Sequence, residues 1–230
     1  MKKKVIPFLI TVAVLAQANS VFAAENITAF TDYNKDLGYG QLSEHWAKSD
    51  IETLLSHNGI SGYPEGDFRA DKKISSAELI AMLLNAAGRV DNLTGDTWSE
   101  QIMNKAYELK LCTAEDIPLS EADAPISREK MALVLVNSAS SFFGEDTSRA
   151  ILIPEVSIAD LNTADEAYRD KIVQAYTLGI VVGTGKNYLP KAATTRAEAS
   201  AVVNRLMKYT DRVDELAEAK ARMNIIGVVD

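Results

Sequence analysis

The chain has 230 residues, of which 47% are hydrophobic and 24% charged, a composition typical of a folded protein. Its formal net charge of −8 excludes a general nucleic-acid-binding role, because affinity for a phosphate backbone requires a basic face. A lone cysteine, Cys112, excludes an intramolecular disulfide and a cysteine zinc site, and the spacing of His45 and His57 fits no standard metal motif. We therefore expect no metal and no cofactor, while one arginine-lined pocket for an acidic ligand remains compatible with the composition.

The N-terminus has the pattern of a secretory signal peptide. Lysines at positions 2–4 precede an apolar stretch over residues 5–16, and small residues around Ala23 form a cleavage site. We expect cleavage after Ala23, with Ala24 as the alternative. An uncleaved anchor is the other interpretation, but the stretch is shorter than the roughly 20 apolar residues that span a bilayer. The pattern predicts export, with no membrane span left after cleavage.

A short polar string followed by an apolar helical pattern occurs three times in the chain. The strings and the helices that follow them are 74–78 with 79–87, 126–130 with 131–138, and 194–198 with 199–207. A further helix is predicted upstream of each string, over 46–56, 98–110 and 167–178. Two sets of positions in these upstream helices are equivalent, namely Ile51, Met103 and Ile172, and Leu54, Ala106 and Ala175.

Each unit is thus predicted to be a helix, a loop and a second helix. The expected boundaries are a signal peptide over 1–23, repeat one over 24–88, repeat two over 89–143, repeat three over 144–209, and a charged helical tail over 210–230. Turn-forming and charged residues over 88–96 and 144–157 mark the connections between repeats.

The polar strings predict how the second helices begin. Ser75 with Glu78, and Thr195 with Glu198, fit the capping box S/T-x-x-E. In repeat two Ser127 keeps the cap, but Lys130 replaces the glutamate, and a cation in the first turn opposes the helix dipole. We expect this helix start to be the weakest of the three, with partial help from Glu129.

The loops of repeats one and three are rich in glycine, whereas the loop of repeat two, 111–125, has none. Glycines in 59–69 predict a tight, structured turn. The string 183–186, Gly-Thr-Gly-Lys, lacks the spacing of a phosphate-binding loop, so we do not interpret it as a nucleotide site.

Together these strings resemble the S-layer homology family. Repeat one carries the resemblance through residues 30–32, 45–47, 59–69 and 74–78, repeat three through 158–160, 179–180 and 195–198, and repeat two mainly through Trp98, Ala106 and Ser127–Arg128. The resemblance implies a mainly α fold in which three helix-loop-helix repeats pack as a pseudo-threefold unit around a central helical bundle, with grooves between repeats. It also implies a monomer.

The ligand implied by the resemblance is an anionic secondary cell-wall polysaccharide, often pyruvylated. A carboxylate suits a guanidinium fork and helix N-termini with free N–H groups. The motif arginines are Arg128 and Arg196, and repeat one has Ser76 at that position. The tryptophan position holds Trp46 and Trp98, and repeat three has Ala167. The remaining candidate residues are Asp32, Asp160, Gly62, Tyr63, Thr195 and Ser127.

No repeat has the full family set, so a working groove must borrow residues from its neighbours. The sequence leaves other roles open: Trp46 and Trp98 as core anchors, the arginines as internal ion pairs with Glu129 or Asp165, and the aspartates as caps. A non-catalytic wall-binding module is the preferred interpretation. The alternatives are a structural or protein-interaction component of the envelope, and a secreted hydrolase, for which no catalytic constellation stands out.

Overall fold

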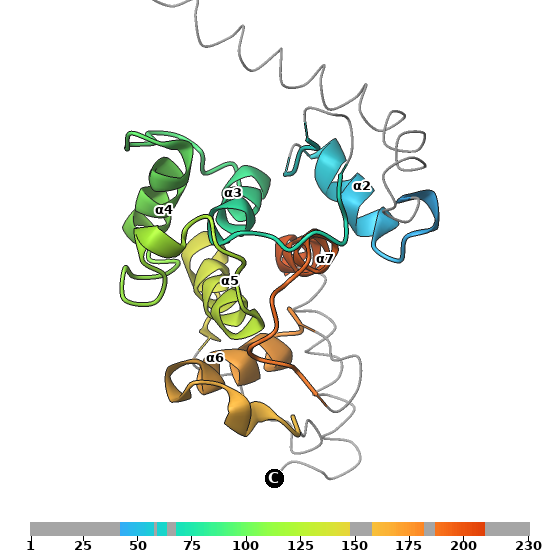
Figure 1. Cartoon of the computed structure of the whole chain (residues 1–230), viewed down its shortest axis with the longest axis vertical. Helices are drawn as coiled ribbons and strands as arrows, with labels where there is room; N and C mark the ends of the chain where they lie inside the picture. Colours follow the sequence, from blue (N-terminus) through green and yellow to red (C-terminus); the bar gives the residue numbers. More distant parts are fainter. Residues whose placement is uncertain (1–41, 58, 64–67, 148–157, 182–186, 210–230) are drawn as a thin grey trace, which may run out of the picture.

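The computed structural model describes residues 42–57, 59–63, 68–147, 158–181 and 187–209 (Figure 1). These contain the α-helices α2 (Lys48–Ser56), α3 (Ser76–Ala86), α4 (Trp98–Glu108), α5 (Arg128–Phe143), α6 (Glu166–Thr177) and α7 (Arg196–Met207). Short 3-10 helices η1 (Leu42–Glu44), η2 (Leu119–Glu121) and η4 (Leu161–Thr163) accompany them, and no β-strand occurs within the described ranges. The predicted signal peptide, Asp32 and the tail lie outside the described residues.

The mainly helical class is confirmed, and so are the helix-loop-helix units. All six positions predicted to be equivalent in the first helices are buried in the core: Ile51, Leu54, Met103, Ala106, Ile172 and Ala175. The second helices begin three residues earlier than predicted, because they start within the polar strings themselves. Helix α5 also runs five residues beyond its predicted end, to a left-handed cap at Gly144.

The helix caps follow the sequence closely. Ser75 and Thr195 each accept a hydrogen bond from the N3 amide, and both capping boxes are closed by a glutamate. Ser127 also caps its helix, but the bond from the Lys130 amide is long, at 3.4 Å, and no box forms. The difference agrees with the expected weakness of the α5 start.

A ring of backbone hydrogen bonds joins the three strings. Ile74 donates to the carbonyl of Thr194, Thr194 donates to Ile126, and Ile126 donates back to Ile74, at 3.0–3.1 Å. Isolated antiparallel bridges accompany the ring, pairing Lys73 with Thr195, Ser75 with Pro125, and Ser127 with Ala193. Each string thus touches both others in the same register. The hydrogen-bond pattern repeats three times.

Next to this ring, further backbone hydrogen bonds use the free amides at the N-termini of α3, α5 and α7. In each helix the amides of N1 and N2 donate to carbonyls in the loop of the next repeat: Ser76 and Ala77 to Ala124 and Ala122, Arg128 and Glu129 to Ala192 and Pro190, and Arg196 and Ala197 to Lys72 and Ala70. The N3 amide bonds to the cap side chain. The implied role of free helix N-termini in anion binding is therefore wrong, because these donors already have backbone or cap partners.

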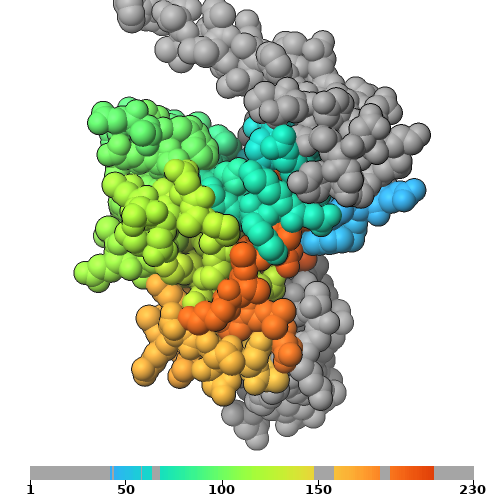
Figure 2. Space-filling model, viewed as in Figure 1, coloured from blue at the N-terminus to red at the C-terminus, as the bar shows by residue number. Residues whose placement is uncertain are grey.

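The first helices pack on neighbouring repeats. Helix α4 packs against α3, α6 against α5, and α2 against α7, so the first repeat closes onto the third. Figure 1 shows α3, α5 and α7 near the centre with the first helices around them. The teal, yellow-green and orange segments of the three repeats adjoin on one face (Figure 2). None of the helices described is long and apolar enough to cross a bilayer.

Candidate functional site

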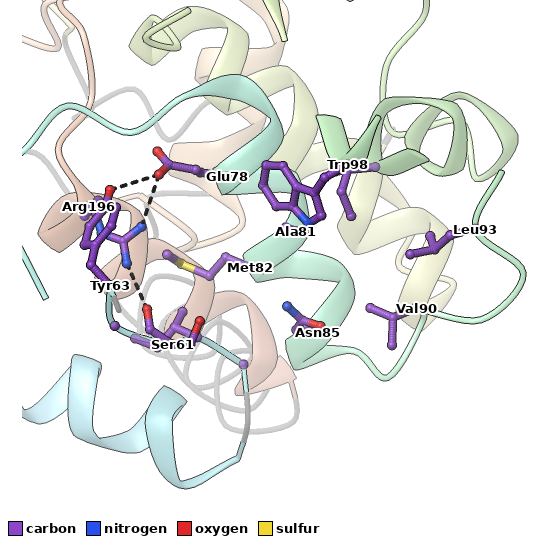
Figure 3. Close-up of a pocket in the computed structure, with 14 residues that line it drawn as sticks. Ser61, Tyr63, Glu78, Ala81, Met82, Asn85, Val90, Leu93, Trp98 and Arg196 are labelled. Carbon is purple, nitrogen blue, oxygen red and sulfur yellow. Dashed lines mark hydrogen bonds and ion pairs between the residues drawn. The ribbon is translucent and has the colours of Figure 1, made fainter. Parts of the chain in front are cut away.

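A groove of about 350 Å³, here called groove A, is assembled from all three repeats (Figure 3). Repeat one supplies the loop residues Gly62 and Tyr63 and one face of α3, repeat two supplies Trp98, and repeat three supplies Arg196. Among its lining residues the argument below uses Ser61, Gly62, Tyr63, Glu78, Asn85, Trp98 and Arg196. Residues that are 135 positions apart in the chain thus meet in one hollow.

Arg196 lies at one end of groove A and is held from several sides. Its Nε donates to the carbonyl of Phe68 at 3.0 Å, and Nη2 donates to that of Ser61 at 3.1 Å. Nη1 lies 3.7 Å from Oε1 of Glu78, which also accepts from the Tyr63 hydroxyl at 2.9 Å. The side chain is only 8% exposed. Arg196 therefore fixes the loop of repeat one to α3 while it lines the groove.

A second groove of about 380 Å³, groove B, has the same construction one repeat further on. Repeat three supplies Tyr188 and one face of α7, repeat one supplies Trp46, and repeat two supplies Arg128. Counted from the helix caps, Glu198 and Arg205 of α7 stand where α3 has Glu78 and Asn85. Groove B therefore contains a second guanidinium that groove A lacks.

Arg128 repeats three of the contacts of Arg196: a loop carbonyl, a glutamate and an aromatic ring. Its Nε donates to the carbonyl of Tyr188 at 2.8 Å, and Nη1 pairs with Oε1 of Glu198 at 2.8 Å. The guanidinium lies over the Tyr188 ring, as that of Arg196 lies over Phe68. The Tyr188 hydroxyl donates back to the backbone carbonyl of Arg128 at 2.8 Å. Two of the three possible arginine positions thus hold an arginine with the same kinds of partner.

Neither arginine has the internal partner named from the sequence. Glu129 and Asp165 both pair with Lys191, whereas the arginines face Glu198 and Glu78. The sequence assigned these glutamates only a capping role, and they fulfil it with their Oε2 atoms. Their Oε1 atoms face the guanidinium groups. This second role could not be read from the chain, because the arginine comes from another repeat.

The two tryptophans are exposed and do not anchor the core. Trp46 is 63% and Trp98 52% exposed, although each begins or precedes a helix that packs on the core. Trp46 lines groove B and Trp98 lines groove A. A large exposed apolar ring beside a hollow is the feature expected of a ligand-contacting residue, since burial against protein would have hidden it.

Asp160 holds the loop that forms one wall of groove B. Its two carboxylate oxygens accept from the amides of Tyr188 and Leu189, both at 2.7 Å. Burial by itself would raise the pKa of Asp160, but these two amides and the nearby charge of Arg128 lower it below its ordinary value. Asp160 thus positions the Tyr188 carbonyl that Arg128 uses. It is not part of the groove lining.

The other predicted residues fall into two groups. Gly62 and Tyr63 line groove A, as the resemblance implied. Thr195 and Ser127 act as helix caps and do not line either groove. Sequence reasoning missed Tyr188 as an arginine partner. Its signal was its position seven residues before the Thr195 cap, which matches Phe68 before the Ser75 cap.

The sequence profile of the S-layer homology domain matches residues 42–80 and 158–200. The chain carries S-layer homology domains. The matched regions coincide with most of repeats one and three, and residues 81–157, which include the degenerate second repeat, lie outside them. S-layer homology domains are cell-wall-anchoring modules without catalytic activity of their own, so the chain is associated with the cell surface.

Three curated relatives align over most of the chain. The S-layer protein sap of Bacillus anthracis is 27% identical over 230 residues, which cover 95% of this chain and 26% of that protein. The amylopullulanase of Thermoanaerobacterium thermosulfurigenes is 23% identical over 84% of this chain and 11% of that protein. Exoglucanase XynX of Acetivibrio thermocellus is 23% identical over 78% of this chain and 17% of that protein. The chain thus spans about a tenth to a quarter of the length of these relatives.

The third interface, between α5 and α6, has none of the groove residues. The equivalent positions hold Ser76 in place of arginine, Lys130 in place of glutamate, and Ala167 in place of tryptophan. Ion pairs take their place: Lys191 bridges Glu129 and Asp165 at 2.7 and 2.6 Å. Glu129 is only 3% exposed and also accepts from the Asp165 amide.

Proposed function

We propose that the protein is a non-catalytic module that anchors to a secondary cell-wall polysaccharide through grooves A and B. The observation that carries the proposal is the spatial convergence of an exposed tryptophan, a guanidinium and a loop from three different repeats, twice over. The tryptophan offers a flat apolar face to a sugar ring, and the guanidinium offers a positive charge to an acidic substituent. The third interface contributes packing only.

The charge of groove B supports an anionic ligand. The chain carries a formal charge of −8, yet groove B combines Arg128 and Arg205 with the single carboxylate of Glu198. Local positive charge on an acidic protein attracts anions to groove B, while the rest of the surface repels them. A pyruvylated polysaccharide, which carries one carboxylate per modified sugar, fits this pattern.

The arginines have internal partners, and this defines how they would act. Each guanidinium is fixed by a loop carbonyl and a glutamate, so its orientation needs no ordering when a ligand arrives. The same occupancy favours the second candidate function, a structural or protein-interaction component of the envelope with degenerate sugar sites. In that case the tryptophans would contact a protein partner.

The experiment is a pull-down of the protein with sacculi from a bacterium whose wall carries a pyruvylated polysaccharide. We expect binding by the unmodified protein, and loss of binding when acid strips the polysaccharide from the sacculi. Trp98→Ala should weaken binding at groove A, and Trp46→Ala binding at groove B, by about 2 kcal/mol, roughly 30-fold, and the double variant should reach background. Leu119→Ala is the control, since Leu119 is exposed but lines neither groove.

Two outcomes would reject the proposal. Equal binding to stripped and intact sacculi would show that the polysaccharide is not the ligand. Absence of sacculus binding, together with co-purification of an envelope protein that Trp46→Ala and Trp98→Ala release, would establish the protein-interaction function. We further propose that the chain acts as a monomer after removal of residues 1–23, with the repeat boundaries given above; size-exclusion chromatography with light scattering tests the monomer.

A further inference from the structure

A second hollow adjoins groove A and is not part of its lining. It has a volume of about 330 Å³ and is lined by Lys72, Lys73, Ser75, Glu78, Trp98, Asp123 and Pro125. Glu78 and Trp98 line both this hollow and groove A. We call it the lysine hollow. The exposed indole of Trp98 therefore borders two adjacent spaces.

The lysine hollow is connected to groove A by a chain of contacts. Lys72 Nζ donates to the Tyr63 hydroxyl at 2.8 Å, and that hydroxyl donates to Glu78 at 2.9 Å. Lys72 Nζ also lies 4.7 Å from the centre of the Tyr63 ring. Lys73 Nζ donates to the carbonyl of Ala193 at 2.8 Å. Both ammonium groups thus have fixed positions, and an ammonium has three donors, of which these bonds use one each.

The two lysines have no counterparts beside groove B. The positions equivalent to Lys72 and Lys73, counted from the helix cap, are Ala192 and Ala193 in repeat three. The position of Tyr63 is occupied by Gly183. The two lysines and the tyrosine that orients one of them therefore occur together on the groove A side only. The molecule itself provides the comparison that isolates their effect.

We infer that the lysine hollow is a second subsite, which binds an anionic substituent on the sugar next to the one in groove A. This inference rests on the proposed function and extends it. Groove A and the lysine hollow together bind two consecutive sugars of the polysaccharide, with Trp98 between them. The ligand chemistry is a carboxylate or phosphate substituent on the second sugar. Groove B binds one residue, and its additional charge, Arg205, lies within the groove.

The test uses the mature chain in a Trp46→Ala background, so that groove A carries the signal. The probe is acid-released wall polysaccharide, fractionated into single sugars and longer fragments and titrated by calorimetry. Lys72→Ala/Lys73→Ala should weaken binding of the longer fragments about five-fold at low salt and leave single sugars unaffected. The difference should shrink in 0.5 M NaCl, where charges are screened beyond a few ångström.

Lys110→Asn/Lys208→Ala is the control, because it removes the same charge from exposed positions outside the hollow, and asparagine tolerates the left-handed backbone of residue 110. Fragments freed of pyruvate and fragments freed of phosphate identify which anion the lysines recognise. The inference would be overturned if the control variant weakened binding as much as Lys72→Ala/Lys73→Ala does. It would also be overturned if Lys72→Ala/Lys73→Ala weakened binding of single sugars as much as binding of longer fragments. Loss of all binding in Trp98→Ala with no effect of Lys72→Ala/Lys73→Ala would refute the lysine hollow alone. Absence of binding by the unmodified chain would refute the proposed function instead.

Discussion

Grooves A and B keep the residues of the family pattern, and the α5–α6 interface does not. The order of residues along the chain conceals this difference. In sequence, each repeat departs from the family pattern somewhere: repeat one at Ser76, repeat two at Lys130, and repeat three at Ala167. In space all three departures belong to one interface. The other two retain tryptophan, arginine and glutamate together. Degeneration that is scattered along the chain is thus concentrated at one of three equivalent places.

The difference also shows what replaces a lost groove. At the α5–α6 interface Lys171 of α6 donates to Asn137 of α5 at 2.9 Å, while Lys130 of α5 turns to η2 of its own repeat and pairs with Glu121 at 2.7 Å. Asn137 occupies the position of Asn85 in groove A and Arg205 in groove B. Side chains that line open space in two interfaces are joined to a neighbouring helix in the third. A packing contact thus occupies the place that the open groove has in the other two interfaces.

The largest predicted effect comes from removing a framework arginine. Arg196→Met leaves Glu78 and the carbonyls of Phe68 and Ser61 without this partner in a largely buried site, so we expect a loss of about 3 kcal/mol of unfolding free energy. Urea unfolding followed by circular dichroism measures it, and exposed Arg89→Met is the control. A loss below 0.5 kcal/mol would show that the contacts of Arg196 do not support the fold.

Placing an arginine in the third interface tests whether the loss of that groove is reversible. Ser76 is buried at the N1 position of α3, and the equivalent of the partner glutamate is Lys130. Ser76→Arg should therefore destabilise the protein by about 2 kcal/mol through overpacking and like-charge repulsion, without adding a binding site. Thermal unfolding and calorimetry on polysaccharide fragments test the two parts. A third site in the titration would show that the interface is still a usable groove.

Asp160 makes the stability of the loop beside groove B depend on pH. Because its pKa is lowered in the folded protein, its contribution is present above the ordinary aspartate pKa, near 4, and is lost as the pH falls through the lowered value. Asp160→Asn should cost about 1 kcal/mol of unfolding free energy at pH 7, and progressively less as the pH falls below the ordinary aspartate pKa. It should also weaken ligand binding at groove B alone. A pH-independent difference would contradict the role of the carboxylate.

The smallest effect concerns Lys110, which follows the end of α4 directly before the glycine-free loop of repeat two. Lys110 adopts φ of 58°, where repeat three has Gly179 at 67°. A lysine in this left-handed region is strained, and glycine is not. We expect Lys110→Gly to stabilise the protein by about 0.5–1 kcal/mol, with Gly179→Ala destabilising it by a similar amount, in thermal unfolding. Unchanged stability in both variants would refute the strain at this position.

Local features could be predicted from the sequence because they depend on residues a few positions apart. The capping boxes at Ser75 and Thr195, the weak cap at Ser127 and the equivalent buried positions in the first helices were all confirmed. The extended reach of α5 was missed, because nothing in the pattern after Ser138 distinguishes helix from connection until Gly144.

Features that depend on contacts between different repeats could not be predicted from the sequence. The pairing of Arg196 with the loop of repeat one joins residues 135 positions apart, and no local pattern encodes it. The occupied amides at the helix N-termini were missed for the same reason, since their acceptors lie in another repeat. Exposure of Trp46 and Trp98 was left open, because a tryptophan at a helix start serves the core or the surface equally well in sequence.

The most direct measurement is the number of binding sites per chain for short fragments of the wall polysaccharide, determined by calorimetry. We predict two sites for the unmodified protein, one for Trp46→Ala, one for Trp98→Ala, and none for the double variant. Three sites in the unmodified protein, or sites that persist in the double variant, would contradict an assembly in which only grooves A and B hold the glycan.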